Sequence, residues 1–178
     1  MIKDNVLSSN KKTKIQDSNS QVYFVDKFKY NIKDKILNGK NILLISNYNL
    51  PKSDKLFFAD AIIDIENKKF NARDIKLSLH KDIFDNSEND PRLNGVSSIG
   101  KPNYTEINKG IFTSCKERDG CPPWSIQAEK IKHDKIKKQL VYDNAILKIY
   151  DFPILYFPKF FHPDPTVKRQ SGFLQPRI

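Results

Sequence analysis

The chain contains few of the residues from which catalytic and metal sites are usually built. It has only two cysteines, and its three histidines, His80, His133 and His162, are scattered along the sequence. A zinc site needs more ligands at an ordered spacing, so we expect no metal and no cofactor. The sequence also contains no glycine-rich phosphate loop and no nucleophile elbow. Its acidic residues lie mostly at turns or between apolar strand residues, where they are usually solvated, and we therefore expect that the protein is not an enzyme.

Long apolar runs are missing as well. No stretch approaches the roughly 18 consecutive apolar residues of a membrane-spanning helix. The amino terminus lacks the apolar core of a secretory signal. Residues 1–20 are dominated by Asn, Ser and Lys, which predicts a flexible polar tail. Apolar residues do not recur at helical spacing in any segment, so we expect no significant helix.

What the sequence does contain is alternation of apolar and polar residues. Between Val22 and Ile32 apolar side chains occupy most alternate positions, which is the pattern of a half-buried strand. After a turn, residues 36–45 return as a second strand. Twelve Phe and seven Tyr suit strands more than helices. The sequence predicts an all-β, antiparallel domain over residues 21–150.

This strand pair recurs along the chain. Asp26, Asp60 and Glu129 occupy equivalent positions, 34 and then 69 residues apart, and a polar-to-apolar step follows each at Asn41, Asp74 and Asn144. Such self-similarity predicts stacked hairpins, although chance repetition in an ordinary meander is the alternative. Residues 85–110 fall where another copy is expected. Their Asn, Ser, Gly and Pro content predicts a long loop or short irregular strands, with turns at 100–104 and 108–112 around one strand.

The net charge of +10 indicates an anionic partner, which could be nucleic acid, phospholipid or a phosphorylated glycolipid. A nucleic-acid-binding β-sheet is an alternative because lysines and aromatics are interleaved in the run Lys27-Phe28-Lys29-Tyr30. Alternation along a strand, however, places the lysines and the aromatics on opposite faces. A stacking platform needs both on one face, so we expect no nucleic-acid partner.

The carboxyl-terminal segment, residues 148–178, contains five of the ten prolines and seven large apolar residues between Phe152 and Phe161. Proline fixes φ and favours extended geometry in the preceding residue, so this segment cannot be a helix. The missing backbone donors also exclude a central strand. We expect an extended connector that docks on the domain before it, or else a rigid tail packed on its own domain.

Two runs in this segment, residues 153–158 (PILYFP) and 162–176 (HPDPTVKRQSGFLQP), resemble the junction of the lipopolysaccharide-assembly protein LptD, or organic-solvent-tolerance, family. The resemblance implies a V-shaped, OstA-like β-jellyroll of stacked hairpins, followed by an outer-membrane barrel that this chain does not contain. The chain would then be a fragment, with its signal peptide absent. Residues 151–178 would form the junction to the barrel, with six positions marking it: Pro153, Pro158, Pro163, Pro165, Arg169 and Gly172.

By the same resemblance, the domain would lie on the periplasmic side of the outer membrane and pass lipopolysaccharide toward the barrel. Its partners would be lipopolysaccharide, a periplasmic bridge protein joined by edge-strand addition, and an outer-membrane lipoprotein that binds the barrel. A soluble bridge protein of the same pathway is an alternative. Acyl chains would lie in an apolar groove lined by inward strand positions. The candidates are Phe28, Tyr30, Ile63, Leu77, Trp124, Ile126 and Leu147.

Cys115 and Cys121 flank a short segment that contains Gly120. A local disulfide and two free buried thiols are both compatible with this spacing. The run Phe112-Thr113-Ser114-Cys115 is similar to an aromatic-Thr-x-Cys pattern of the LptD family. That resemblance implies an oxidising compartment and disulfides to cysteines near the carboxyl end of the barrel.

Overall fold

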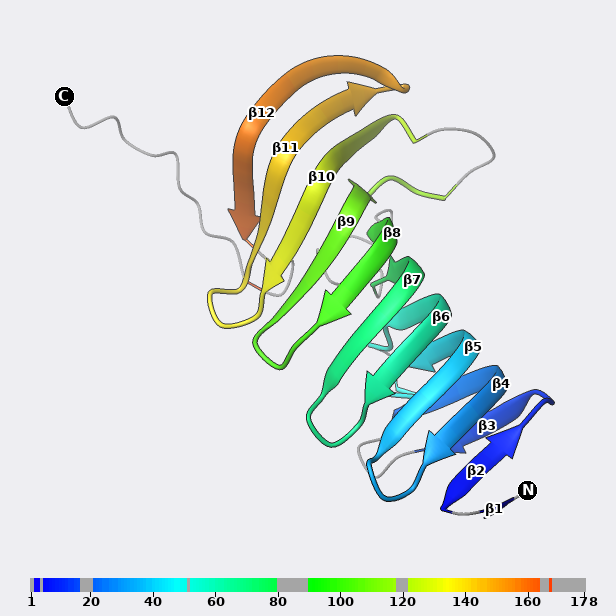
Figure 1. Ribbon diagram of the computed structural model, residues 1–178. Coiled ribbons are helices and arrows are strands. Elements are labelled where there is room, and N and C mark those ends of the chain that lie inside the picture. The colour runs from blue at the N-terminus through cyan, green and yellow to red at the C-terminus, as the bar shows by residue number, and fades with distance from the viewer. Residues whose placement is uncertain are drawn as a thin grey trace.

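The computed structural model describes residues 2–3, 5–16, 21–50, 52–79, 90–117, 122–163 and 167. These residues form one antiparallel sheet in which neighbours along the chain are, with one exception, neighbours in the sheet (Figure 1). The exception is β3, which pairs with β4 beside β2. The strands are β1 (Ile2–Lys3), β2 (Val6–Ser9), β3 (Thr13–Gln16), β4 (Val22–Asn31), β5 (Ile36–Ile45), β6 (Lys55–Asp64), β7 (Lys69–Ser78), β8 (Arg92–Gly100), β9 (Tyr104–Thr113), β10 (Trp124–Asp134), β11 (Gln139–Ile149) and β12 (Phe152–Pro163). The described part contains no helix of the length and apolarity needed to cross a membrane.

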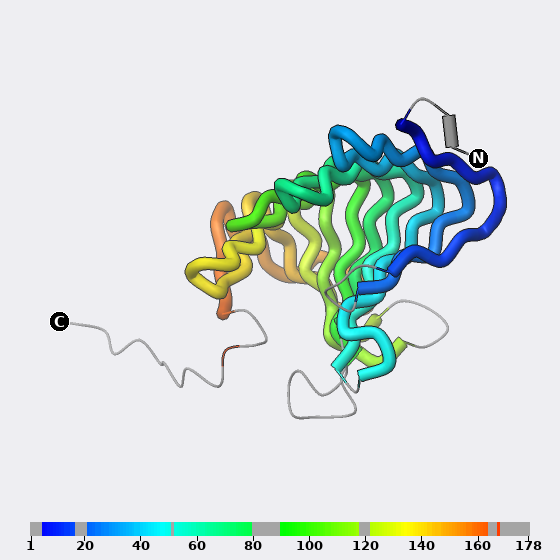
Figure 2. The backbone as a smooth tube through the Cα atoms, turned by 90° about the horizontal axis from the view of Figure 1, so that it is seen from below, coloured from blue at the N-terminus to red at the C-terminus, as the bar shows by residue number. Residues whose placement is uncertain are grey.

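The predicted all-β fold of stacked antiparallel hairpins is confirmed. Strands β4 to β11 make four hairpins, and each hairpin pairs with the next along its full length. The sheet does not close on itself, because the described part of β12 pairs with β11 alone and the other end of the sheet consists of β1, β2 and β3. Seen from below, the stack forms a bent trough rather than a flat sheet (Figure 2).

The bend comes from one residue in every second strand. Four residues in the middle of β5, β7, β9 and β11 have positive φ, between 50° and 52°: Asn41, Asp74, Lys109 and Asn144. The buried residue before Asn41 is Leu37, and the buried residue after it is Ile42. These two are an odd number of positions apart, so in a regular strand they would face opposite sides. A left-handed residue therefore shifts the alternation, so that side chains from both halves of the strand face the same interior. We call this line of residues the crease, and the two parts that it divides the half-sheets.

The hairpin turns have a local cause in the sequence. In three of them the residue before the turn, Asn31, Asp64 or Asp134, accepts hydrogen bonds from backbone N–H groups within the turn. The last turn residue has positive φ in each case: Lys35, Lys68 and Lys138. Asn and Asp side chains stabilise such turns by replacing backbone partners. The β11–β12 turn is different, because both central residues, Tyr150 and Asp151, have positive φ, as in a type I′ hairpin.

The expected loop at residues 85–110 is a regular hairpin from residue 92 onward. Strands β8 and β9 pair from Arg92↔Thr113 to Gly100↔Thr105, and residues 101–103 form the turn. The second turn, expected at 108–112, is instead the crease of β9. Lys109 is left-handed there, and Gly110 is needed because a Cβ at this position would lie 2.4 Å from Cδ1 of Ile131. Glycine next to a left-handed residue thus marked a bend inside a strand.

The amino-terminal segment also differs from the expectation of a polar tail over residues 1–20. Strands β2 and β3 both pair with β4, one with each half-sheet. Leu7 and Ile15 supply the apolar contacts, because both pack against the core cluster. Two isolated apolar residues in a polar segment were too weak a pattern to predict strands.

The core lies between the half-sheets, where small side chains on one half-sheet pack against large side chains on the other. In the first two hairpins the small residues Gly39, Ala61 and Ala72 lie on the half-sheet nearer the hairpin turns, and larger side chains lie opposite. A Cβ on Gly39 would meet Ile42 and Val25, for example, at 2.9 Å and 3.0 Å. In the last two hairpins the order reverses. Gly95, Gly110, Ala128 and Ala145 are then the small residues, and Ile107 and Ile131 fill the space opposite.

Candidate functional site

The interior between the half-sheets is the candidate site that the sequence predicted. Phe28 and Ile63 belong to the buried core cluster, and four further candidates, Tyr30, Leu77, Trp124 and Ile126, pack against that cluster. Leu147 pairs with Ile126 in register and is half-buried. The structure therefore brings the seven predicted residues together on one continuous inner surface, although they come from five strands.

Side chains fill this interior. Phe28 is 6% exposed and Ile63 9% exposed, and most other core residues are more deeply buried. A lipid chain can enter such a space only if the half-sheets separate, because a close-packed core has no room for an extra chain. The candidate site is thus an apolar layer between two surfaces rather than an open cleft.

The inner surface becomes exposed at the last strand. Leu155 in β12 faces Leu147 across the pair and is 52% exposed, whereas Phe157 and Phe160 are half-buried against the core. The other face of β12 also carries exposed apolar side chains, Tyr156 and Phe161, and Phe152 and Ile154 near the start of the strand are exposed as well. Exposed apolar groups on both faces of one edge strand form a surface that favours contact with another apolar surface.

An aromatic cluster holds β12 against the inner surface. Tyr142 is fully buried, and its hydroxyl lies 2.8 Å from Nε2 of His162, whose ring stacks on the tyrosine ring at a centroid distance of 5.4 Å. Burial raises the pKa of the Tyr142 hydroxyl well above its usual range. The phenol therefore stays neutral and can donate to His162. Phe112 and Phe160 contact the same histidine ring.

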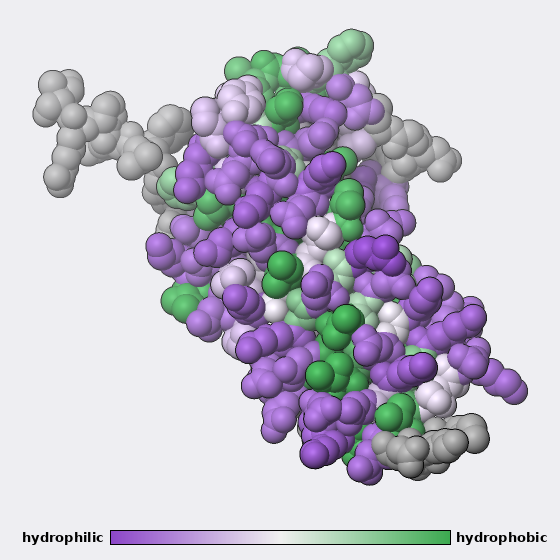
Figure 3. All heavy atoms as spheres, in the orientation of Figure 1, coloured by the Kyte–Doolittle hydropathy of each residue, from purple (hydrophilic) through white to green (hydrophobic). Residues whose placement is uncertain are grey.

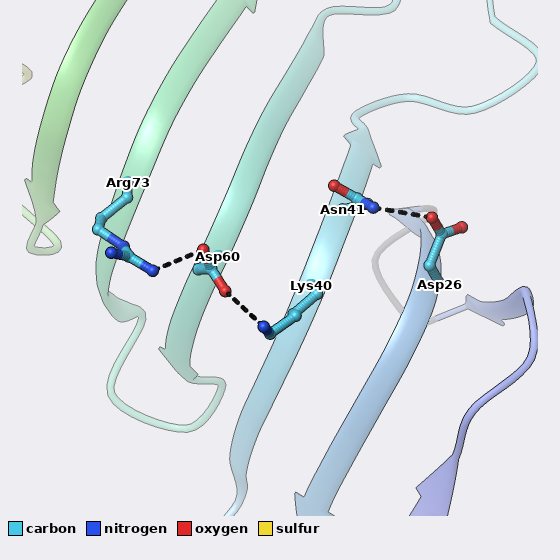
Figure 4. Close-up of polar contacts among 5 residues, drawn as sticks. All are labelled: Asp26, Lys40, Asn41, Asp60 and Arg73. Atoms are coloured by element: carbon cyan, nitrogen blue, oxygen red, sulfur yellow. Dashed lines mark hydrogen bonds and ion pairs between the residues drawn. The ribbon is translucent and has the colours of Figure 1, made fainter.

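The outer surface of the same strands carries charge. Asp60 in β6 lies next to the crease, between Lys40 in β5 and Arg73 in β7. Its carboxylate accepts a hydrogen bond from Arg73 at 2.8 Å and lies 3.8 Å from Nζ of Lys40 (Figure 4). These residues border a shallow hollow of about 510 Å³, to which Lys27 and Lys29 also contribute. The view in Figure 3 shows a mainly hydrophilic surface with hydrophobic side chains scattered over it. Sequence reasoning did not predict this hollow, because its residues occupy the positions expected to be solvated.

The cysteine and junction predictions are covered only in part by the described residues. Cys115 forms no disulfide with any described residue and is half-buried, with Sγ 3.8 Å from the backbone oxygen of Trp124. Cys121 lies outside the described residues, so a disulfide of either cysteine stays a prediction. Pro153, Pro158 and Pro163 lie in β12, the edge position that the missing proline donors require. Pro165, Arg169 and Gly172 lie outside the described residues.

Within the part of the chain that the structure describes, no three His, Cys, Asp or Glu side chains gather into a possible metal site. Among the described residues, the titratable groups with a perturbed pKa are Asp64, Asp134, Lys135 and Tyr142, and the two carboxylates directly precede hairpin turns. Tyr142 is in the core, and Lys135 is in the β10–β11 turn. They do not converge on one cleft, as an acid–base pair would have to do.

Comparison with known proteins supports the resemblance that the sequence suggested. The chain is 36% identical over 72 residues to an LPS-assembly protein LptD of Legionella pneumophila (strain Paris), which is 40% of this chain and 8% of that protein. It is 29% identical over 135 residues to an LPS-assembly protein LptD of Shewanella denitrificans, which is 72% of this chain and 17% of that protein. A similar protein of Polaromonas sp. (strain JS666), with the same name, is 27% identical over 124 residues. No family model matches the chain.

The matches span less than a fifth of the length of these curated relatives. All of them carry the name LptD, so the predicted resemblance to the LptD family is confirmed. The chain is an LptD-like sequence with an all-β structure of stacked hairpins.

Proposed function

We propose that this chain acts in lipopolysaccharide assembly, and that its two half-sheets open to carry lipopolysaccharide acyl chains between them. The observation that carries this proposal is the continuous inner surface on which Phe28, Ile63 and Ile126 lie with the other four candidates. Each buried methylene contributes about 0.8 kcal/mol, so a lipid with several acyl chains would compensate for the core packing that opening disrupts. Transfer then needs an apolar path and no covalent chemistry.

The names of the relatives and the shape of the sheet support this proposal. Proteins called LPS-assembly protein LptD match up to 72% of the chain. The half-sheets meet at the crease and end in two separate rims, so opening at the rims would expose the inner surface along its whole length (Figure 2). Lipid could then move from hairpin to hairpin toward β12, where Leu155 is already exposed.

The two ends of the sheet supply the proposed partner surfaces. At one end, β1 and β3 are edge strands, and a periplasmic bridge protein would extend the sheet there by strand addition. At the other end, β12 belongs to residues 151–178, the proposed junction to an outer-membrane barrel and its lipoprotein partner. The domain would accordingly lie on the periplasmic side of the outer membrane.

Of the two alternatives, nucleic-acid binding is disfavoured by the side-chain arrangement. Phe28 is buried in the interior, whereas Lys27 and Lys29 are exposed, so the lysines and this aromatic ring do not share a surface. A soluble bridge protein would have the same hairpin architecture. The names of the relatives favour the LptD role over that alternative.

Photo-crosslinking tests the proposal with a matched control at each position. A crosslinker at Ile63, Leu77 or Ile126, whose side chains lie on the inner surface, should capture lipopolysaccharide. The neighbouring residues Ile62, Lys76 and Gln127 alternate onto the outer surface and should capture little. Equal capture at inner and outer positions would contradict an internal path. Binding of oligonucleotides with a steep salt dependence, and no lipid adduct, would favour the nucleic-acid alternative.

A further inference from the structure

The described residues of the two rims of the bent sheet carry opposite net charge. The turn rim consists of the hairpin turns 32–35, 65–68, 101–103 and 135–138, and it has seven lysines against two carboxylates, Asp34 and Glu66. The connection rim consists of the segments that join successive hairpins. Its described residues include two lysines, Lys52 and Lys116, against four carboxylates: Asp54, Asp90, Glu117 and Asp151. An anionic group at the mouth of the trough would therefore be attracted to the turn rim and repelled from the connection rim.

Two lysines on the turn side lie over one aromatic ring, and a third lies beside them. Nζ of Lys132 lies 4.7 Å from the centroid of Tyr104, and Nζ of Lys101 lies 5.3 Å from the same centroid. Nζ of Lys135 lies 3.4 Å from the backbone oxygen of Lys101. The β8–β9 and β10–β11 turns are joined by a hydrogen bond from Lys135 N–H to the oxygen of Asn103, at 3.0 Å. This contact fixes the separation of the two turns and brings their lysines together.

The nearby carboxylates have other close partners, although the charge of Lys132 also acts on Asp134. Glu106 lies 3.1 Å from Nζ of Lys130. Asp134 accepts hydrogen bonds from the backbone N–H groups of Ile136 and Lys137 at 3.1 Å and 3.0 Å. Among the described residues, Lys101, Lys132 and Lys135 make no ion pair with Asp or Glu. Three cations held together in this way repel one another, and a bound anion would remove that repulsion. Partial burial also lowers the pKa of Lys135, as expected for a cation without a compensating charge.

We propose that Lys101 and Lys132, which lie over Tyr104, form together with Lys135 the binding site for the phosphate of a lipid headgroup whose acyl chains enter between the half-sheets. This inference rests on the proposed function, because it assigns the headgroup of the same lipid. Lys132 directly follows the fully buried Ile131 in β10, so its side chain points to the outer surface. Lys101 and Lys135 lie in turns of the rim at which the half-sheets end. A phosphate at the cluster would therefore lie outside the apolar core and next to that rim, where the headgroup of a lipid with inserted acyl chains has to lie.

A lipid headgroup fits this position better than a soluble phosphate. The cluster is on the outermost turns of the last two hairpins, next to the strands at which the inner surface becomes exposed. Lysine ammonium groups are mobile point charges that suit a phosphate monoester without demanding a fixed geometry. The opposite charge of the connection rim would orient the lipid, with its phosphates toward the hairpin turns.

The test uses the 178-residue chain and a diphosphorylated lipid A in detergent micelles, with the dephosphorylated lipid as the comparison. The cluster variant is K101Q/K132Q/K135Q. The control variant, K52Q/K76Q/K116Q, removes the same number of charges from the connection rim and the outer surface. We expect the cluster variant to bind the phosphorylated lipid about tenfold or more weakly, since charge-assisted hydrogen bonds are lost. Its binding of the dephosphorylated lipid should be unchanged, and the control variant should stay within about twofold of the wild type for both lipids.

Other results would overturn the inference in distinguishable ways. If the wild type binds both lipids equally, or if both variants weaken equally, the chain carries lipid but the cluster is not the headgroup site. If inorganic pyrophosphate competes at the affinity of the lipid, the cluster is a site for free phosphate instead. If the wild type binds neither lipid, the proposed function fails and the headgroup site with it. The variant K101R/K132R/K135R, which keeps the charge, should retain binding, and its failure to do so would show a structural effect.

Discussion

Asn144 in β11 donates a hydrogen bond from Nδ2 to the Glu129 carboxylate in β10, at 2.7 Å. The two residues lie opposite each other at the crease of the last hairpin. The same relation occurs at the other end of the stack, where Nδ2 of Asn41 lies 2.9 Å from Oδ2 of Asp26 (Figure 4). In both pairs the separation along the chain is 15 residues. The asparagine is left-handed in each, so one side chain both tolerates the bend and ties it to the neighbouring strand.

We expect the crease residues to differ in how well they suit positive φ. Asn144→Ala should lower the free energy of unfolding by about 1–2 kcal/mol, because alanine is strained in the left-handed region and the hydrogen bond to Glu129 is lost. Lys109→Asn should raise it by about 0.5 kcal/mol, because asparagine tolerates this conformation better than lysine. Urea denaturation midpoints measure both effects.

Two exposed strand residues with ordinary φ serve as controls. Asn71→Ala and Lys76→Asn make the same chemical changes away from the crease and should stay within about 0.5 kcal/mol of the wild type. A loss for Asn71→Ala as large as that for Asn144→Ala would show that the crease residues have no special role in the bend.

The sequence was sufficient to predict three of the four hairpins, because alternation over a ten-residue strand leaves few other structures possible. The β8–β9 hairpin was missed, because the Asn, Ser, Gly and Pro content of its segment indicated a loop. Strand β5 begins and ends where the alternation places it, at Ile36 and Ile45. The polar-to-apolar steps at Asn41, Asp74 and Asn144 were also found, and they are three of the four crease residues. The fourth, Lys109, was missed because lysine has no preference for positive φ and the glycine beside it indicated a turn.

The inner surface could be predicted for the same reason, since alternation determines which side chains share a face. The lysine cluster could not be predicted. Lys101 and Lys135 are 34 residues apart, and only the pairing of β9 with β10 brings their turns together. Whether Lys101 in its turn and Lys132 in β10 point toward one ring depends on side-chain packing, for which a single sequence holds no periodic signal.

The aspartate turns should make stability depend on pH in the acid range. Hydrogen bonds from the backbone N–H of Lys137 hold the pKa of Asp134 below its usual range, and Asn67 does the same for the pKa of Asp64. A carboxyl whose folded pKa is lowered stabilises the protein above its unfolded pKa, and that contribution is lost as pH falls through the folded pKa. The urea midpoint of the wild type should therefore fall below about pH 4.

Asparagine replaces aspartate in the first hairpin turn, where Asn31 accepts the equivalent hydrogen bonds from Lys33 and Asp34. The double variant D64N/D134N should reproduce this arrangement, so its two turns should remain folded at neutral pH. Its urea midpoint should then change less between neutral pH and about pH 3 than that of the wild type. An unchanged pH dependence would mean that other carboxyl groups are responsible for the acid sensitivity.

Packing across the crease predicts coupling between Gly110 and Ile131. A Cβ on Gly110 would lie 2.4 Å from Cδ1 of Ile131, and the variant Gly110→Ala should cost about 1–3 kcal/mol through this overlap. Ile131→Val removes that methyl group at a cost of about 0.5–1.5 kcal/mol. The double variant should be more stable than the sum of the single changes predicts, by at least about 0.5 kcal/mol.

Gly95 provides the comparison for this cycle. Its Cβ would meet Ile107 rather than Ile131, at 2.2 Å, so Gly95→Ala should be additive with Ile131→Val within about 0.5 kcal/mol. Coupling of equal size in both cycles would point to a general loosening of the core instead of a specific contact.

The hydrogen bond between Tyr142 and His162 should decide how firmly β12 stays on the sheet. Tyr142→Phe keeps the buried ring but leaves Nε2 of His162 without the hydroxyl, which should cost about 0.5–1.5 kcal/mol. Tyr156→Phe is the matched control, because that hydroxyl donates to Asn144 Oδ1 at 2.7 Å on an exposed surface, where water replaces a lost partner. Hydrogen exchange should show faster exchange of β11–β12 amides in Tyr142→Phe alone, while amides of β6 and β7 keep their protection. If both variants loosen β12 equally, the buried histidine contact is no stronger than a surface hydrogen bond, and ring packing alone holds the strand.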